Sequence, residues 1–434
     1  MTAHEGILLD NTLALGAKGY GWLPDLRRRN AGRPAVTTRL LGRHTTALHG
    51  REAVRFFYDE KHVKRQSALP GPVLDTLFGR GAVHTLDGRA HAARKALFMS
   101  LLKDGGGVAA LEERARAEWD DATALWAAEP RIELFTEAGV AITRAVCAWA
   151  GIPLTGSEAR QTAADLLAMV DGFATAGPRH WRARRARVRQ EEQLMGLVEG
   201  VRKMEREHAR EGGTESEITE DSALRAVALH RDHEGELLDP HTAAVEVLNI
   251  IRPTAAVAWF MTFTAHALHR RPGLREALRD GDREYAEAFA HEVRRFYPFV
   301  PFVAGLAAGE LTWQGTTIPE GSVVLLDVYG HHHDPELWSD PYTFDPTRFL
   351  GREPAGDELI AQGGGDAAGG HRCPGEDITV ALLRSLAPRL ARMEYEVVPD
   401  QDLTIPLRRV PTRPRSGFLM TGVYAGSTAL AAMR

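Results

Sequence analysis

Apolar residues recur every three or four positions through much of this chain, which is the spacing of one face of an α-helix. This spacing is combined with many Ala, Glu, Arg and Leu residues, which favour helix, in residues 109–126, 161–170, 190–209 and 243–268. Strand-type patterns come late in the chain, where they predict a hairpin with a glycine turn and then a short buried strand, in residues 311–321 and 322–328. The pattern therefore predicts a mainly α-helical protein with a small β region.

Composition narrows the possible classes of protein. Hydrophobic residues make up 44% of the 434 positions, which is enough for a large core, and no repeat or long linker divides the chain. We expect a single domain over residues 1–434, with residues 1–15 and 425–434 loosely held. The formal net charge of -5 argues against a nucleic-acid partner, which would favour a basic surface.

The two cysteines cannot build a disulfide framework, which favours a reducing, intracellular setting. The N-terminus lacks a basic region followed by an apolar stretch, so it does not resemble a signal peptide. No window reaches the roughly 18 apolar residues of a membrane span. We therefore expect a soluble, cytoplasmic protein.

One cysteine occupies a chemically unusual position. Cys373 lies in the segment Gly-Gly-His-Arg-Cys-Pro-Gly-Glu at residues 369–376, directly ahead of an apolar, helix-forming run. We expect a thiolate there to be stabilised by the charge of Arg372 and by backbone N–H groups at the helix start. Haem iron is the best-known metal with a single cysteine ligand. Cys147, in contrast, is predicted to be a small buried residue.

Two further segments agree with a haem site. Glu292 and Arg295 are one helical turn apart, and Arg348, in Phe-Asp-Pro-Thr-Arg-Phe at residues 344–349, could reach Glu292. The order Glu-x-x-Arg, Phe-x-Pro-x-Arg-Phe, Gly-x-x-x-Cys-x-Gly resembles the cytochrome P450 superfamily over nearly the whole chain from about residue 75. The resemblance implies the P450 fold in one haem-containing domain. It also implies haem b with Cys373 as its axial ligand, and a structural triad of Glu292, Arg295 and Arg348.

The chain departs from the usual P450 pattern at two places. Asp366 stands where most members have a phenylalanine, seven residues before the cysteine. Arg252 and Pro253 occupy the region where most members carry an acid–alcohol pair in the long helix over the haem. Pro253 lacks an N–H group and predicts a kink. Arg252 lies among apolar residues and needs a partner, which is either an internal carboxylate or the carboxylate of a substrate.

The Arg-Pro pair, the segment Phe-Val-Pro-Phe at residues 299–302 and the long loop before Cys373 are similar to one subgroup, the hydrogen-peroxide-dependent fatty-acid peroxygenases. The resemblance implies a fatty acid held on Arg252, whose carboxylate supplies the acid–base group that the helix lacks. Oxidation is then confined to carbons near the tethered head group, giving 2- or 3-hydroxy acids or a terminal alkene. No redox partner is expected to be required.

His84 falls where decarboxylating members of the subgroup carry histidine and several hydroxylating members carry glutamine. It favours decarboxylation with α/β-hydroxylation beside it, although an orienting or merely packed histidine is the alternative. The catalytic candidates are thus Arg252, His84 and Pro253. By the same resemblance, the residues expected to line the alkyl channel are Phe78, Val170, Phe173, Val300 and Phe302. The residues expected to hold the haem propionates are Arg65, His91, Lys95 and His371.

Three other functions remain open. The first is a peroxygenase that only hydroxylates. The second is a monooxygenase that receives electrons from a protein partner, for which the basic run at residues 179–189 would be a docking patch rather than a solvated helix face. The absent acid–alcohol pair argues against it. The third is a non-catalytic haem or fatty-acid sensor, for which a thiolate-ligated iron beside the carboxylate would be superfluous.

Overall fold

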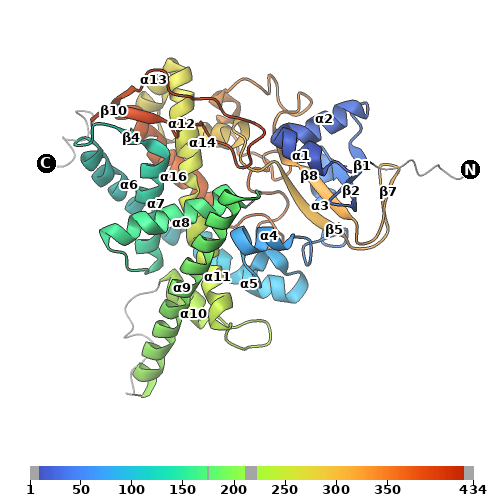
Figure 1. The fold of residues 1–434 in the computed structure, drawn as a ribbon, viewed down its shortest axis with the longest axis horizontal. Helices are drawn as coiled ribbons and strands as arrows, with labels where there is room; N and C mark the ends of the chain where they lie inside the picture. Colours follow the sequence, from blue (N-terminus) through green and yellow to red (C-terminus); the bar gives the residue numbers. More distant parts are fainter. Residues whose placement is uncertain (1–8, 174, 211–221, 425–434) are drawn as a thin grey trace, which may run out of the picture.

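A computed structural model describes residues 9–173, 175–210 and 222–424. As the apolar pattern predicts, the protein is mainly α-helical; a five-stranded sheet lies at one side with the first three helices, whereas the strands at residues 132–133 and 419–424 lie at the opposite side (Figure 1). The predicted loose ends at residues 1–8 and 425–434 lie outside the described residues, whereas residues 12–18 form a helix.

The α-helices are α1 (Thr12–Lys18), α2 (Trp22–Arg29), α3 (Arg51–Phe57), α4 (Gly71–Val73), α5 (Gly88–Leu102), α6 (Gly105–Trp126), α7 (Leu134–Ala150), α8 (Gly156–Gly172), α9 (Pro178–Arg210), α10 (Ala223–Leu229), α11 (Pro240–Ala255), α12 (Val257–Arg270), α13 (Pro272–Asp280), α14 (Arg283–Phe296), α15 (Val328–His332) and α16 (Glu376–Arg392). Short turns of other helix types are η1 (Gly19–Gly21), η2 (Leu74–Phe78), η3 (Val83–Thr85) and η5 (Pro346–Phe349).

The strands are β1 (Ala35–Leu40), β2 (Arg43–Leu48), β3 (Val63–Lys64), β4 (Ile132–Glu133), β5 (Phe302–Ala307), β6 (Leu311–Trp313), β7 (Thr316–Ile318), β8 (Val323–Asp327), β9 (Glu394–Val397) and β10 (Leu419–Tyr424). They form a five-stranded sheet in the order β1-β2-β8-β5-β3, a three-stranded sheet β4-β10-β9, and the two-stranded β6-β7. The β6-β7 hairpin and the buried strand β8 confirm the two strand predictions.

Helices α11 and α12 form the centre of the large helical core. Residues 240–270 are long and apolar enough to cross a membrane, but 94% of their most apolar window is buried inside the protein, as in a core helix. The segment is interrupted at Ala256, three residues after Pro253. Because a proline has no N–H group to donate to the carbonyl of Asn249, the interruption agrees with the predicted kink.

The basic run at residues 179–189 forms the start of the long helix α9, and its members have different surroundings. Arg187 is buried, Arg179 pairs with Asp171, and Arg189 pairs with Asp165. Four arginines of the run, at residues 182, 184, 185 and 189, are exposed, and of these Arg189 pairs with Asp165. The solvated-face interpretation therefore fits only part of the run.

Candidate active site

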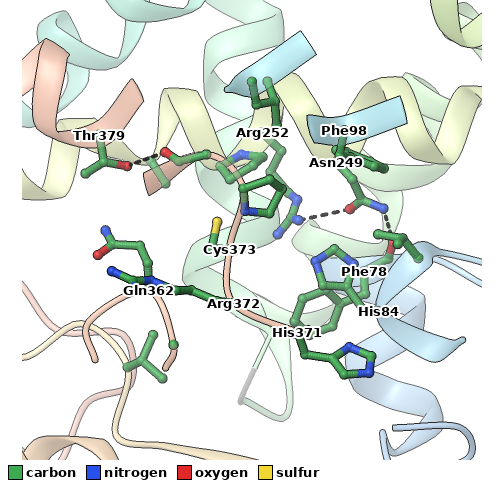
Figure 2. A pocket seen from close by; sticks show the side chains of 18 of the residues that line it. Phe78, His84, Phe98, Asn249, Arg252, Gln362, His371, Arg372, Cys373 and Thr379 are labelled. Atoms are coloured by element: carbon green, nitrogen blue, oxygen red, sulfur yellow. Dashed lines mark hydrogen bonds between the residues drawn. The ribbon is translucent and has the colours of Figure 1, made fainter. Parts of the chain in front are cut away.

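Cys373 lies at the end of a glycine-rich loop, just before the first turn of α16, as its sequence context predicts. Its backbone N–H donates to the carbonyl of Gln362 at 2.9 Å, which fixes the loop across its base. Gly363 in this loop has φ +95°, and a Cβ there would lie 2.7 Å from the Tyr58 hydroxyl, so only glycine fits. The Cys373 side chain lines an internal cavity of about 330 Å³ (Figure 2).

The Cys373 thiol is not activated in the way its neighbours in sequence suggest. Burial raises its pKa, and the opposing effects of the Gly375 backbone N–H and of the Lys95 charge are smaller. The Arg372 guanidinium instead donates to Glu376 Oε2 at 2.7 Å. Arg372 therefore pairs with Glu376, and its stabilisation of a thiolate stays a prediction. A bound metal cation would itself keep this sulfur deprotonated.

The structure brings together the three residues of the expected triad. Arg295 donates twice to Glu292, at 2.7 Å from Nε to Oε2 and 2.7 Å from Nη2 to Oε1. Arg348 Nε lies 3.2 Å from Glu292 Oε2. Glu292 and Arg295 are completely buried, and Arg295 also donates to the carbonyl of His332 at 2.7 Å. Such charges are tolerated in a core only because they are paired and hydrogen-bonded.

A second buried ion cluster lies beside this triad, and the sequence analysis did not identify it. Arg294 donates to Gln362 Oε1 at 2.8 Å and pairs with Glu376, which also accepts from Arg372. Burial raises the pKa of Glu376, but the two arginine charges outweigh it and hold the pKa at about 2. The four-residue spacing of Arg372 and Glu376 at a helix start was the available signal.

On the opposite side of the cavity lies Arg252, which is 4% exposed. Its Nη2 donates to Asn249 Oδ1 at 3.0 Å, its Nε has no hydrogen-bond partner, and its guanidinium carbon is 5.7 Å from the Phe78 ring centroid. No carboxylate in the described part of the chain forms an ion pair with it. Burial, followed by repulsion from Arg187, lowers its pKa to about 9. The structure thus lacks the internal ion pair that was one of the two expected partners.

Pro253 and His84 lie in the same cavity wall. Pro253 is exposed although it belongs to a buried helix, and it lines the cavity. His84 lies in η3 with its ring 4.4 Å from the Phe78 ring, and its Nδ1 is buried without a partner. Burial, followed by the Arg252 charge, lowers the pKa of His84 to about 3. The imidazole is therefore neutral near pH 7 in these surroundings.

Four of the five predicted channel residues line the cavity: Phe78, Val170, Phe173 and Val300. Phe302 does not. Its ring packs edge-on against Trp22, with centroids 6.0 Å apart, because it is directed to the other face of β5. Successive residues of a strand point to opposite faces, and it is the next residue, Val303, that lines the cavity.

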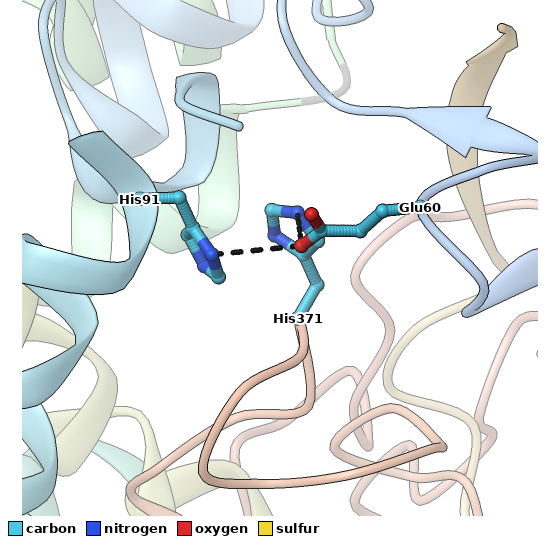
Figure 3. A group of neighbouring side chains, drawn as sticks. All are labelled: Glu60, His91 and His371. Atoms are coloured by element: carbon cyan, nitrogen blue, oxygen red, sulfur yellow. Dashed lines mark ion pairs between the residues drawn. The ribbon is translucent and has the colours of Figure 1, made fainter. Parts of the chain in front are cut away.

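The Lys95 end of the cavity carries three of the predicted propionate ligands, His91, Lys95 and His371, and burial lowers the pKa of His91 to about 4, so that His91 is neutral near pH 7. The rings of His91 and His371 stack with centroids 4.0 Å apart. Glu60 Oε1 lies 3.7 Å from His91 Nδ1 and 3.4 Å from His371 Nε2 (Figure 3). Burial lowers the pKa of Lys95 to about 8. Arg65 does not line the cavity, although it is buried and its Nη1 lacks a partner.

These surroundings fit a haem. The group requires an axial ligand for iron, such as a cysteine sulfur, apolar walls for the porphyrin and hydrogen-bond donors or cations for two carboxylates. Cys373 supplies the first, apolar residues such as Phe98, Ile250 and Ile378 supply the second, and the Lys95 end supplies the third. Glu60, His91 and His371 are also close enough to hold a metal ion. His91 and His371 line this cavity, so we assign all three residues to its Lys95 end.

Comparison with known proteins agrees with this geometry. The cytochrome P450 family model matches residues 279–415. Cytochrome P450 4A7 of Oryctolagus cuniculus is 25% identical over 195 residues, which are 44% of this chain and 33% of that protein, so the chain spans about a third of that relative's length.

Solved structures match over nearly the whole length. Cytochrome P450SP alpha (CYP152B1) in complex with (R)-ibuprofen is 42% identical, with TM-score 0.89, over 96% of this chain and 99% of that one. Ligand-free cytochrome P450 OleT is 34% identical, with TM-score 0.89, over 98% and 99%. An OleT variant in complex with arachidonic acid matches with TM-score 0.88 and 34% identity over 97% of each chain.

Proposed function

Because the chain belongs to the cytochrome P450 superfamily and, within it, to the CYP152 group of fatty-acid peroxygenases, we propose that it uses hydrogen peroxide to decarboxylate fatty acids to terminal alkenes, with α/β-hydroxylation as an accompanying reaction. The observation that carries the proposal is the unpaired, buried guanidinium of Arg252 in the cavity that Cys373 also lines. The proposal requires no redox partner, and it includes a cytoplasmic location for the protein.

The proposed substrate is a carboxylic acid with a long apolar chain. A guanidinium stays charged when it is buried, and its planar fork of donors matches a carboxylate. Arg252 Nε has no hydrogen-bond partner among the described residues and can donate to a carboxylate oxygen. Phe78, Val170, Phe173 and Val300 offer apolar surface to the alkyl chain. The ligands in two solved relatives, (R)-ibuprofen and arachidonic acid, are both carboxylic acids.

Cys373 would hold the haem, which would supply the iron for peroxide activation and C–H oxidation. The work of the chain is to place the substrate. Arg252 fixes the carboxylate, so that its oxygen can accept and return a proton where this helix has no acid–alcohol pair. Pro253 has no N–H group and no side-chain acid or alcohol, so the proton transfer is left to the substrate carboxylate. The tether limits oxidation to the carbons next to the head group.

The two outcomes share their reactants. Hydroxylation converts the acid and one H2O2 into the 2- or 3-hydroxy acid and one water. Decarboxylation converts the acid and one H2O2 into the terminal alkene, one CO2 and two waters. His84 is proposed to favour the second outcome by hydrogen bonding near the carboxylate. Burial and the Arg252 charge lower the pKa of His84 to about 3, and a carboxylate bound beside it would raise that pKa.

The first experiment is product analysis. The purified haem protein is incubated with hexadecanoic acid and hydrogen peroxide, without any redox protein, and the products are separated by gas chromatography. Pentadecene is the expected product, with 2- and 3-hydroxyhexadecanoic acid beside it. Hydroxy acids alone would retain the peroxygenase function and remove the decarboxylase function.

A matched variant tests the role of His84. His84→Gln keeps a hydrogen-bonding side chain of similar size and is expected to lower the alkene-to-hydroxy-acid ratio while total peroxide-driven turnover persists. An unchanged ratio would show that His84 is merely packed. Absence of every product with peroxide, together with activity when a ferredoxin and its reductase are added, would replace the proposal with a redox-partner monooxygenase.

A further inference from the structure

The Arg252 guanidinium is held by a chain of buried polar groups that extends away from the cavity. Arg252 Nη2 donates to Asn249 Oδ1 at 3.0 Å, and Asn249 Nδ2 donates to Glu246 Oε2 at 3.2 Å. Glu246, Asn249 and Arg252 follow one another at intervals of three residues along α11. Glu246 is 0% exposed and Asn249 is 4% exposed. The chain therefore lies in the interior, where each hydrogen bond constrains the next.

The amide of Asn249 can adopt only one orientation in these surroundings. Its Nδ2 faces two acceptors, Glu246 Oε2 and the carbonyl of Phe78 at 3.0 Å (Figure 2). Reversing the amide would place its oxygen against both acceptors and its NH2 group against the Arg252 guanidinium, leaving three contacts without a donor–acceptor match. The amide oxygen is consequently directed at Arg252.

Glu246 also anchors the segment that carries His84. Its Oε1 accepts from the backbone N–H of Val83 at 2.8 Å and from Arg94 Nη1 at 2.6 Å. The Arg94 charge, from α5, balances the buried carboxylate. One carboxylate thus fixes η3, which contains His84, and, through Asn249, the Arg252 side chain. The two groups that face the substrate share a single anchor.

The arrangement separates orientation from charge. If a carboxylate occupied the position of Asn249, it would form an ion pair with Arg252 and compete with an incoming anion. The neutral amide orients the guanidinium but leaves its charge unbalanced. The nearest carboxylate along the hydrogen-bond chain, Glu246, already pairs with Arg94.

We infer that Asn249 and Glu246 are positioning residues that hold Arg252 and the His84 segment in place while keeping the Arg252 charge available for a substrate carboxylate. This inference deepens the proposed function and rests on it. Neither Asn249 nor Glu246 takes part in the chemical reaction itself. Asn249 acts through Arg252, and Glu246 acts through Asn249 and Val83.

The test is a double-mutant cycle on hexadecanoate binding, read from the haem absorbance change during titration of the holoprotein. Asn249→Asp is isosteric, places a carboxylate beside Arg252 and also removes the amide donor to Glu246 and to the Phe78 carbonyl. It is expected to weaken hexadecanoate binding about 10- to 100-fold, the effect of losing a charge-assisted hydrogen bond. In an Arg252→Leu background the same substitution is expected to change the dissociation constant less than about twofold, because the group it acts through is absent.

A second substitution covers the case in which Asn249→Asp does not fold. Asn249→Leu removes the acceptor without adding charge and is expected to weaken binding less, again only when Arg252 is present. Gln190→Glu is the matched control, since Gln190 is a buried amide that donates to Asp165 and does not line the cavity. It converts an amide to an acid and should leave the dissociation constant unchanged.

The outcomes separate the two levels of the argument. Equal weakening by Asn249→Asp in both backgrounds, or none in the presence of Arg252, would overturn the positioning role while peroxide-driven turnover of the unaltered protein still supports the proposed function. Hexadecanoate binding that does not depend on Arg252 at all would overturn the proposed function and the positioning role together.

Discussion

The two sides of the cavity handle buried charge in opposite ways. On the Cys373 side, Glu292 pairs with Arg295 and Arg348, and Glu376 pairs with Arg294 and Arg372. On the other side, Arg252 is 4% exposed and has an amide oxygen as its partner. Buried charges with internal partners hold a scaffold together, whereas a buried charge without one costs stability. The charges on the Cys373 side are therefore balanced by residues of the chain itself, whereas the Arg252 charge is left for a ligand to balance.

The largest effect on stability is expected when the central acid on the paired side, Glu292, is replaced. Glu292→Gln leaves Arg295 and Arg348 buried without a carboxylate, which should lower the free energy of unfolding by about 3–5 kcal/mol and reduce haem retention. Urea unfolding and the ratio of haem to protein absorbance measure both. The control is Glu207→Gln in the exposed Lys203–Glu207 pair, for which we expect a change below about 0.5 kcal/mol. Equal effects at the two sites would contradict the scaffold role of the triad.

Removing the unpaired charge of Arg252 should change the free energy of unfolding in the opposite direction. Arg252→Leu is expected to raise the free energy of unfolding of the fatty-acid-free protein by about 1–3 kcal/mol, because it replaces a desolvated charge with an apolar side chain. Unfolding must be measured without fatty acid, since a bound ligand adds stability of its own. A loss of stability as large as that of Glu292→Gln would mean that Arg252 is a structural residue.

A smaller effect is expected from His84 when the pH is changed. The pKa of His84 is about 3 in the folded protein and about 6.5 in an unfolded chain, so the unfolded state binds the additional proton. Stability is therefore lost as the pH falls from about 6.5 toward 3, and by pH 5 the loss is about 2 kcal/mol. His84→Gln removes this term, so the variant should gain about 2 kcal/mol relative to the unaltered protein between pH 7.5 and pH 5. Parallel pH profiles of the two proteins would contradict a neutral, desolvated His84.

The smallest effect is expected on the outer face of α9. Arg184 and Arg185 are exposed, and no ion pair within the described residues involves them. Replacing both with glutamine should change the free energy of unfolding by less than about 0.5 kcal/mol and leave peroxide-driven turnover unchanged. Ferredoxin-driven turnover that falls in this variant and is restored by excess ferredoxin would instead indicate that this face docks an electron-transfer partner.

Features coded by short sequence patterns were predictable. The hairpin at residues 311–321 and the helix after Cys373 depend on local spacing and turn residues, and both are present. The interruption near Pro253 follows from a missing N–H group. The Glu292–Arg295 pair is one turn apart, so its geometry is set by the helix itself.

Features that depend on distant segments were not predictable in the same way. Glu246 and Arg94 are 152 positions apart, and nothing local shows that they meet. Phe302 looked like a channel residue, but the pairing of β5 with β8 decides which face it takes, and that face packs on Trp22. The Arg372 charge looked free until the fold placed Glu376 against it.

The most direct test of the unpaired charge compares two ligands that differ only in the head group. Hexadecanoate and hexadecan-1-ol are titrated into the haem protein and into Arg252→Leu, and the dissociation constants are compared. We expect the unaltered protein to prefer the acid by about 100-fold or more, since two charge-assisted hydrogen bonds are at stake. In Arg252→Leu that preference should disappear while alcohol binding persists. A preference for the acid that survives the loss of Arg252 would contradict the account.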